Sequence, residues 1–148
     1  MKACYMTGNR DAPQTLYPAI CKAVHELAEA QGVALFITGG RGRFEHMAAQ
    51  AVQEAKGSHP DIRLCFLLAY HPGQRSVQVP AGYDESLYPL EKSALPRIAI
   101  ARVNRHMVDH CLACILYAAL PGNSRKILDR ARVRAARGQL LLIDLSEA

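Results

Sequence analysis

Four short apolar, strand-like runs in this chain each end in glycine or proline beside a polar or basic residue. The four endings are Thr7-Gly8-Asn9-Arg10, Thr38-Gly39-Gly40-Arg41-Gly42, His71-Pro72-Gly73-Gln74 and Pro121-Gly122-Asn123-Ser124. If such runs form an open parallel sheet, the loops that leave the carboxyl ends of its strands converge on one edge. Ligands bind in the crevice at that edge, so we place the function there.

The pattern between these endings predicts alternating helices and strands. Apolar residues recur at helical spacing, and a glycine follows the last turn, over residues 15–31, 44–56 and 125–137. Strands are expected over residues 2–7, 33–38, 62–70, 111–120 and 139–145. The predicted fold class is α/β, a three-layer domain with a mostly parallel sheet of about five strands.

The middle of the chain breaks this alternation. Residues 71–96 contain four prolines and two glycines, which predicts a long loop with a short helix near residues 84–88 and makes the segment a candidate lid. Residues 97–110 are expected to hold a short strand at 98–100 and a helical turn at 104–109.

Length and composition limit the class of protein. A chain of 148 residues, half of them apolar, is long enough for one core, so we expect a single domain over residues 1–148. No stretch approaches the roughly 20 apolar residues of a membrane helix, and no signal-peptide pattern follows Met1, so we expect a cytoplasmic location and no membrane partner. Five cysteines in apolar or helical runs indicate reduced, buried thiols.

The net charge of +5, with arginine in excess over lysine, favours an anionic partner, either a nucleotide or a nucleic acid. At the second corner, Gly39, Gly40 and Gly42 would let backbone N–H groups approach a phosphate at the start of a helix. Tight-turn geometry alone also explains such a cluster. Arg10 and Arg41 would bind the same phosphate, or else are solvated surface arginines.

Three further groups of residues are candidates for chemistry. Glu45 is either a ribose acceptor or a general base, although the helix dipole alone favours a glutamate in a first turn and we prefer that explanation. The run from Asn104 to Asp109 would form a wall of the site, and Arg105 would pair with Asp109 at i, i+4. The last corner adds Gly122, Asn123 and Ser124.

No metal site and no cofactor are predicted. Cys111 and Cys114 have C-x-x-C spacing, but in a strand these positions point to opposite faces and cannot share one metal. His106 and His110 could share one helix face, yet no third ligand is evident near them in the sequence.

The last predicted helix is strongly basic. It carries Arg125, Lys126, Arg130, Arg132, Arg134 and Arg137 against Asp129 alone. These side chains form either a solvated face or an electrostatic footprint for nucleic acid. Because no aromatic residues interleave with them for base stacking, the solvated face is favoured.

Several segments resemble the motifs of one protein family. Thr7-Gly8-Asn9-Arg10 is similar to an opening T-G-H-R, residues 38–45 with Ala48-Ala49 are similar to S-G-G-x-x-G-x-D-x-x-A-A, and Gly73-Gln74 is similar to a G-Q pair. Residues 104–109 match R-N-R-Y-M-V-D from its asparagine onward. On these motifs the chain resembles the YpsA-like branch of the SLOG superfamily, Rossmann-like domains that include the DprA and LOG proteins.

The resemblance implies a Rossmann-like domain that binds a nucleotide or nucleotide-derived ligand at the carboxyl edge of the sheet, as a homodimer. The phosphoribohydrolases of the superfamily carry P-G-G-x-G-T-x-x-E in the final loop. This chain lacks the glycine-threonine pair there, and only Asp129 stands near the place of the glutamate.

Three functions follow as hypotheses. The first is a sensor or binding module, in which amides of Gly39, Gly40 and Gly122 with Arg10 and Arg41 hold a phosphate, while Asn9, Gln74 and Asn104 fix the sugar or base. The second is a phosphoribohydrolase or N-glycosidase acting on nucleoside monophosphates through Glu45 or Asp129. The third is nucleic-acid binding through the basic C-terminal helix.

Overall fold

The computed structural model describes residues 1–71, 73, 78–90 and 95–147. Its centre is a six-stranded, wholly parallel sheet in the order β4-β3-β2-β1-β5-β6. The strands are β1 (Ala3–Gly8), β2 (Leu35–Thr38), β3 (Arg63–Leu67), β4 (Glu85–Leu87), β5 (Ala113–Tyr117) and β6 (Leu141–Asp144). The predicted α/β class with a parallel sheet is confirmed, with six strands rather than about five.

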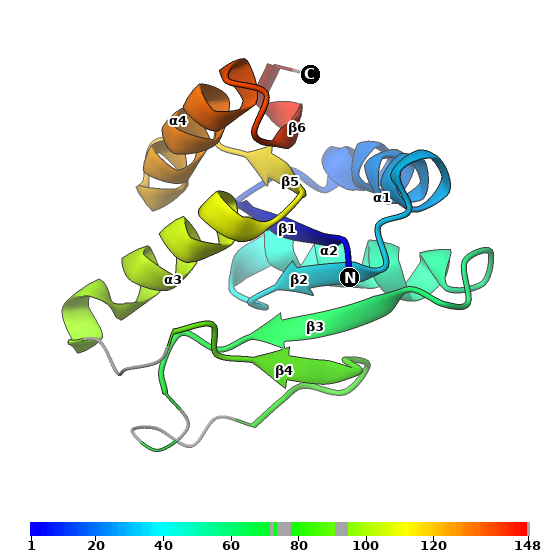
Figure 1. Cartoon of the computed structure of the whole chain (residues 1–148), viewed down its shortest axis with the longest axis horizontal. Helices are drawn as coiled ribbons and strands as arrows, with labels where there is room; N and C mark the ends of the chain where they lie inside the picture. The colour runs from blue at the N-terminus through cyan, green and yellow to red at the C-terminus, as the bar shows by residue number, and fades with distance from the viewer. Residues whose placement is uncertain (72, 74–77, 91–94, 148) are drawn as a thin grey trace.

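Two pairs of helices cover the two faces of this sheet, which makes three layers (Figure 1). Helices α1 (Tyr17–Gln31) and α2 (Gly42–Ala55) pack on one face, and α3 (Pro96–His110) and α4 (Asn123–Ala136) pack on the other. Short 3-10 turns precede α1 (Gln14–Leu16) and follow β6 (Leu145–Glu147). In β1, Cys4 and Met6 join the core under α1 and α2, whereas Tyr5 joins the core under α3 and α4.

The expected helix near residues 84–88 is wrong, because this segment forms the edge strand β4. The exposed edge of β3 offers hydrogen-bond partners that a local pattern cannot reveal. The Asp84 N–H donates to the Leu64 carbonyl at 2.9 Å, and the Leu68 N–H donates to the Leu87 carbonyl at 2.8 Å. Pairing with a distant strand therefore decides the structure here.

The expected strand at residues 98–100 is also wrong, because α3 runs without a break from Pro96 to His110. Proline suits the first turn of a helix, and Ala99, Val103 and Met107 recur every four residues on the buried face. The helix therefore starts eight residues before the predicted helical turn at 104–109 and includes the segment that was predicted as a strand.

The two cysteines of the C-x-x-C pattern do not lie on opposite faces of a strand. Cys111 follows the last residue of α3, outside β5, and both Cys111 and Cys114 belong to the core under α3 and α4. Burial raises the pKa of the Cys111 thiol to about 12 and raises the pKa of Cys114 as well. Both thiols therefore stay protonated at neutral pH.

The order of the strands positions the candidate site. From β1 the chain proceeds to β2 on one side, and the later strand β5 pairs with β1 on the other side. The carboxyl ends of β1 and β5 are therefore the topological switch point, where open α/β sheets bind ligands. Across the described ranges, no helix combines the length and apolar character that a membrane crossing requires.

Candidate functional site

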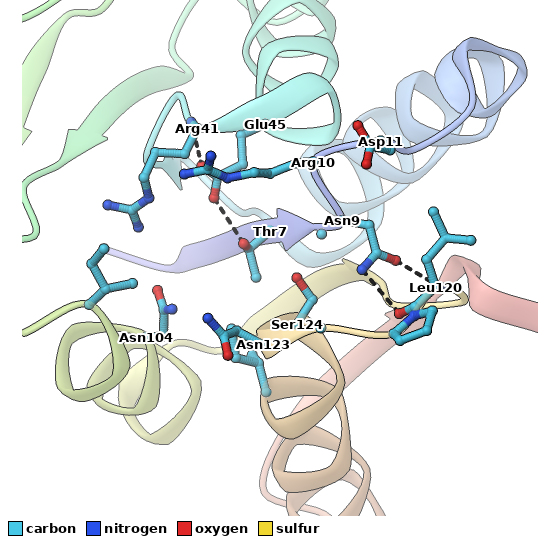
Figure 2. Close-up of a pocket in the computed structure, with 15 residues that line it drawn as sticks. Thr7, Asn9, Arg10, Asp11, Arg41, Glu45, Asn104, Leu120, Asn123 and Ser124 are labelled. Carbon is cyan, nitrogen blue, oxygen red and sulfur yellow. Dashed lines mark hydrogen bonds between the residues drawn. The ribbon is translucent and has the colours of Figure 1, made fainter. Parts of the chain in front are cut away.

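A cavity of about 320 Å³ opens at the carboxyl ends of β1 and β5 (Figure 2). Its walls come from the end of β1 and its exit loop, the start of α2, one face of α3, and the β5–α4 loop. The lining residues are Thr7, Gly8, Asn9, Arg10, Asp11, Arg41, Glu45, Ile100, Asn104, Leu120, Pro121, Gly122, Asn123, Ser124 and Ile127. Gly8 and Gly122, which are 114 residues apart in the chain, therefore meet at one place, as the sequence predicted.

Gly8 closes the floor of this cleft because no side chain fits there. A Cβ on Gly8 would lie 2.6 Å from Cγ of Phe44 and 2.8 Å from the Tyr117 carbonyl oxygen. The end of β1 consequently lies flat against both β5 and α2.

Gly42 holds the β1 exit loop against the start of α2. Its φ is +84°, and a Cβ there would lie 2.6 Å from Cα of Arg10. Beside this contact the Arg43 N–H donates to the Arg10 carbonyl at 2.9 Å. The backbone of Arg10 is therefore fixed, while its exposed side chain lines the cleft.

Glu45 is buried at the cleft wall, with 2% of its surface exposed. Its Oε2 accepts the Thr7 hydroxyl at 2.8 Å and its Oε1 accepts the Arg41 N–H at 2.6 Å. Burial raises the pKa of the Glu45 carboxyl above its ordinary value, against the opposing effects of the Arg41 charge and these hydrogen bonds. The carboxyl thus joins β1 to the N-terminus of α2 and also reaches the cavity.

The raised pKa of Glu45 predicts a pH-dependent stability. Because the folded protein holds this proton more tightly than the unfolded chain, the stabilisation is complete below the ordinary pKa and is lost as pH rises through the raised pKa. In urea titrations from about pH 4 to about pH 8, the stability of Glu45→Gln relative to wild type should rise with pH, because only the wild type must ionise a buried carboxyl. Parallel profiles for the two proteins would contradict the assignment.

Asn9 joins the two loops that meet at the switch point. Its side-chain Oδ1 accepts the Leu120 N–H at 3.1 Å, and its Nδ2 donates to the Leu120 carbonyl at 3.2 Å. The Asn9 N–H also donates to the Tyr117 carbonyl at 3.0 Å. Both the oxygen and the nitrogen of the buried amide therefore bind backbone groups of Leu120. Asn9 thus has a structural role beside its expected role in ligand binding.

Replacing Asn9 with alanine should lower the free energy of unfolding by about 1–3 kcal/mol, because Leu120 loses both partners. Asn9→Asp should lose a similar amount, since it places a carboxylate oxygen against the Leu120 carbonyl. Urea denaturation measures the change. Exposed Asn123 in the same cleft is the control, and Asn123→Ala should stay within about 0.5 kcal/mol of wild type; equal losses for Asn9→Ala and Asn123→Ala would refute the role of Asn9.

The N-terminus of α4 opens on the cleft. Within the described residues no side chain caps this helix, and its first turn consists of Asn123, Ser124 and Arg125 behind Gly122. The φ of Gly122 is +144°. The Arg125 N–H donates to the Gly122 carbonyl at 3.2 Å. The N–H groups of Asn123 and Ser124 precede the first bonds of the helix and have no partner within it, and the helix dipole adds partial positive charge there. This end of the cleft is therefore suited to an anion.

Asn104 reaches the cleft from α3, one turn after Ile100. It is buried, and its side-chain Oδ1 accepts the hydroxyl of Tyr5. The fixed amide lies opposite Thr7 and Arg41 in Figure 2. Asn104 thus offers an oriented polar group beside the apolar surface of Ile100 and Ile127.

Several predicted site residues that the structure describes lie outside the cleft. Gly40 faces Phe66 and Tyr83, Gly39 lies beside Glu45 and Arg41, and Gly42 packs on Arg10. Exposed Arg105 lies 4.0 Å from Asp109, as predicted, and exposed Asp129 lies 3.7 Å from Arg125. The remaining predicted residue, Gln74, falls outside the described ranges.

The basic face of α4 is largely engaged by acidic groups. Arg130 binds Asp109 with two hydrogen bonds, of 2.6 and 2.9 Å, and Arg132 binds Asp144 at 2.6 and 3.0 Å. Arg134 donates to the Asp109 carbonyl at 3.0 Å. The hydrogen bond from Arg130 is the main cause that lowers the pKa of Asp109. These arginines tie α4 to α3 and β6, which neither the solvated nor the nucleic-acid interpretation anticipated.

Some lining residues were not predicted to bind ligand. They are Thr7, Asp11, Ile100, Leu120, Pro121 and Ile127. Thr7 and Pro121 belong to the predicted corners without having been assigned a role there, and Leu120 directly precedes one of these corners. Ile100 was missed because its helix was predicted as a strand, and its four-residue spacing from Asn104 is the signal that would have revealed it.

No protein-family model and no curated protein sequence matches the chain. Among solved structures, the chain is similar to that of DNA processing protein A from Helicobacter pylori, a structure that describes the single-stranded DNA binding mode of that protein. The identity is 13%, the TM-score is 0.56, and the match covers 96% of this chain and 75% of that one. The likeness shows a shared fold.

Proposed function

We propose that this protein binds a nucleotide or a nucleotide-derived phosphorylated small molecule in the switch-point cleft, as a sensor or binding module. The observation that carries the proposal is the uncapped N-terminus of α4, which shares one cavity with Arg10 and Arg41. A volume of about 320 Å³ lies at the lower end of the range of about 300–1,000 Å³ for small-ligand sites.

The phosphate would lie at the start of α4. Backbone N–H groups of Asn123 and Ser124 would donate to its oxygens, and the helix dipole would favour its charge. Arg10 and Arg41 would add charge-assisted hydrogen bonds from the other wall. Gly122 leaves the approach to these N–H groups open, because its nearest side-chain neighbour lies 3.9 Å from where a Cβ would be.

The sugar and base would lie toward α3. Glu45 would accept a ribose hydroxyl, the Asn104 amide would bond a base edge or a sugar oxygen, and Ile100 and Ile127 would pack on the base. This arrangement agrees with the resemblance to the YpsA-like branch, whose best-matched motif begins at Asn104. The homodimer that the resemblance implies stays a prediction, which sedimentation equilibrium would test.

Two measurements test the proposal. Native mass spectrometry of the purified protein should reveal a phosphorylated nucleotide-like adduct, and calorimetry against nucleoside mono- and diphosphates should give one site per chain. Binding should be weaker for the matching nucleoside that lacks phosphate. No heat with any nucleotide, or equal binding of nucleoside and nucleotide, would refute it.

Glycosidic hydrolysis is the second candidate, and the buried carboxyl of Glu45 in the cleft favours it. A carboxyl with a raised pKa suits general acid or base catalysis. Asp129, the other candidate, lies outside the cleft. Incubation with nucleoside monophosphates should then release free base, measured by chromatography, and Glu45→Gln should abolish the release. No free base from wild type at high protein concentration would reject this activity.

Single-stranded nucleic acid is the third candidate, favoured by the fold that the chain shares with a protein whose single-stranded DNA binding has been described. The logarithm of the binding constant should then fall linearly with the logarithm of the salt concentration, with a slope of about −0.7 for each phosphate contacted. Fluorescence anisotropy of a labelled oligonucleotide across a salt series measures this slope. A slope near zero, or no binding, would reject it.

A further inference from the structure

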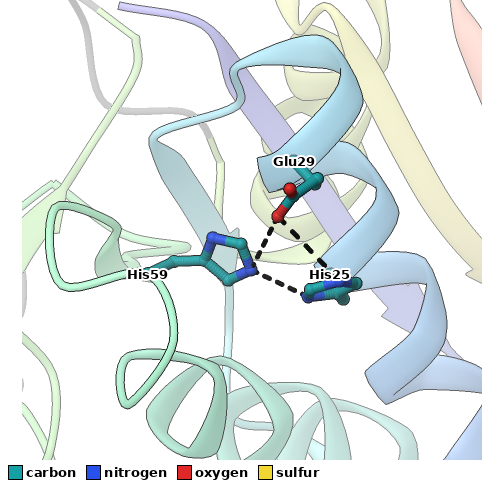
Figure 3. Close-up of side chains that lie close together, drawn as sticks. All are labelled: His25, Glu29 and His59. Atoms are coloured by element: carbon teal, nitrogen blue, oxygen red, sulfur yellow. Dashed lines mark hydrogen bonds and ion pairs between the residues drawn. The ribbon is translucent and has the colours of Figure 1, made fainter.

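We propose that His25, Glu29 and His59 bind one divalent transition-metal ion such as Zn²⁺. The site lies at the amino edge of the sheet, opposite the cleft. Figure 3 shows the three side chains converging, two from α1 and one from the turn after α2. The proposal concerns a second site and does not depend on the proposed function.

The scaffold holds the three side chains on fixed backbone. His25 and Glu29 are four residues apart on α1, so they lie on the same face one turn apart. His59 is fixed on both sides, because its N–H donates to the Ala55 carbonyl at 2.9 Å and its carbonyl accepts the Ile62 N–H at 3.2 Å. All three side chains therefore stand on regular or hydrogen-bonded segments, as metal ligands require.

The spacing of the ligand atoms fits a small cation. His59 Nε2 lies 2.8 Å from His25 Nδ1 and 3.8 Å from Glu29 Oε2, and Glu29 Oε2 lies 4.0 Å from His25 Nε2. Two ligands at about 2.1 Å from a tetrahedral Zn²⁺ are about 3.4 Å apart. His25 faces His59 through Nδ1, in a hydrogen bond, and faces Glu29 through Nε2. An ion would therefore replace that hydrogen bond, and the His25 ring would turn so that one nitrogen faces both other ligands.

The ligand set selects the metal. Two imidazole nitrogens and one carboxylate oxygen suit Zn²⁺, Co²⁺, Ni²⁺ or Cu²⁺ and are poor ligands for Mg²⁺ or Ca²⁺. The three side chains are 56%, 67% and 14% exposed for His25, Glu29 and His59, so an ion can enter from solvent and keep a water as its fourth ligand.

The position of the site indicates its role. Glu29 lies near the end of α1 and His59 precedes β3, so both lie at the amino edge of the sheet. A bound ion would brace α1 against the α2–β3 turn, away from the cleft. Metal binding would therefore stabilise the fold rather than take part in chemistry at the switch point.

A histidine pair on α3 provides a matched control. His106 and His110 are also four residues apart, with stacked rings, but the Nδ1 of His110 bonds the carbonyl of His106. Among the described residues, three side chains that can ligate a metal come together at one place, and they are His25, Glu29 and His59.

Titration of the full chain with Co²⁺ under reducing conditions tests the proposal. We expect one ion per chain, a visible spectrum without a thiolate charge-transfer band, and competition by Zn²⁺. His25→Asn and His59→Asn should each weaken binding more than about 10-fold, while His110→Asn should leave it unchanged. At a Zn²⁺ concentration 100-fold above Kd, the Tm of wild type should rise by about 5–10 °C.

Three outcomes would overturn the proposal. They are no binding to wild type, a thiolate spectrum that places the ion on cysteine, or binding by His25→Asn equal to that of wild type. Circular dichroism of the metal-free variants confirms that each is folded. Glu29→Gln keeps the shape of the side chain and should also weaken binding, so retained affinity in that variant would remove Glu29 from the ligand set.

Discussion

Replacing Gly42 with alanine should lower the free energy of unfolding by about 3 kcal/mol or more, the largest effect expected of a single methyl group in this chain. A non-glycine residue at φ +84° is strained by about 1–3 kcal/mol. The new Cβ would also lie 2.6 Å from Cα of Arg10, and overpacking against backbone costs about 1–3 kcal/mol more. Chemical denaturation with urea measures the sum.

Gly138 is the matched control for this substitution. Its φ is +72°, and a Cβ there would meet nothing within 4 Å. Gly138→Ala should therefore lose stability through the backbone strain alone, of about 1–3 kcal/mol as at Gly42. The difference between the two variants isolates the close approach of the β1 exit loop to α2. If Gly138→Ala and Gly42→Ala lose equal stability, that approach contributes nothing.

Removing both Arg10 and Arg41 should weaken binding of the phosphorylated ligand by about 100-fold to 10,000-fold. A charge-assisted hydrogen bond contributes about 1.5–3 kcal/mol, so each single alanine variant should lose about 10-fold to 100-fold. Calorimetry with a nucleoside monophosphate and with its nucleoside separates the two contributions. Affinity for the nucleoside monophosphate should fall, whereas affinity for the nucleoside should stay nearly constant.

Arg105→Ala is the control for the arginine variants. Arg105 is exposed, lies outside the cleft, and makes a surface ion pair of 4.0 Å with Asp109, so its removal should leave affinity unchanged. Equal losses in Arg105→Ala and Arg10→Ala would mean that general charge, rather than the cleft, governs binding. An unchanged affinity in the double variant would remove both arginines from the site.

The sequence predicted those parts of the fold that local patterns determine. Helical spacing with a terminal glycine located α1, α2 and α4, and continuous apolar runs located the inner strands. The edge strand β4 was not predictable in this way, because three residues carry no periodicity and their structure depends on the open edge of β3. The start of α3 was missed because Pro96 and the apolar residues after it also suit a loop and a strand.

The candidate site was predicted in position more than in detail. Loops that follow parallel strands meet at one edge of a sheet, and this was enough to predict that the corners of Gly8 and Gly122 lie together. It could not show that Gly42 packs on Arg10 or that Asn9 spans to Leu120. Those contacts join residues far apart in sequence, and only the assembled loops reveal that a glycine or an amide has a packing role there.

The placement of β1 at the centre of the sheet has a consequence for synthesis on the ribosome. β1 is made before the other strands of this sheet, yet its neighbour β5 emerges much later, since Cys4 pairs with Ala113. Until then one edge of β1 and the apolar face that α3 and α4 later cover remain open in the nascent chain. Completion of the sheet must therefore wait for the C-terminal third, and the incomplete chain is the stage at which its apolar surface is most exposed to aggregation.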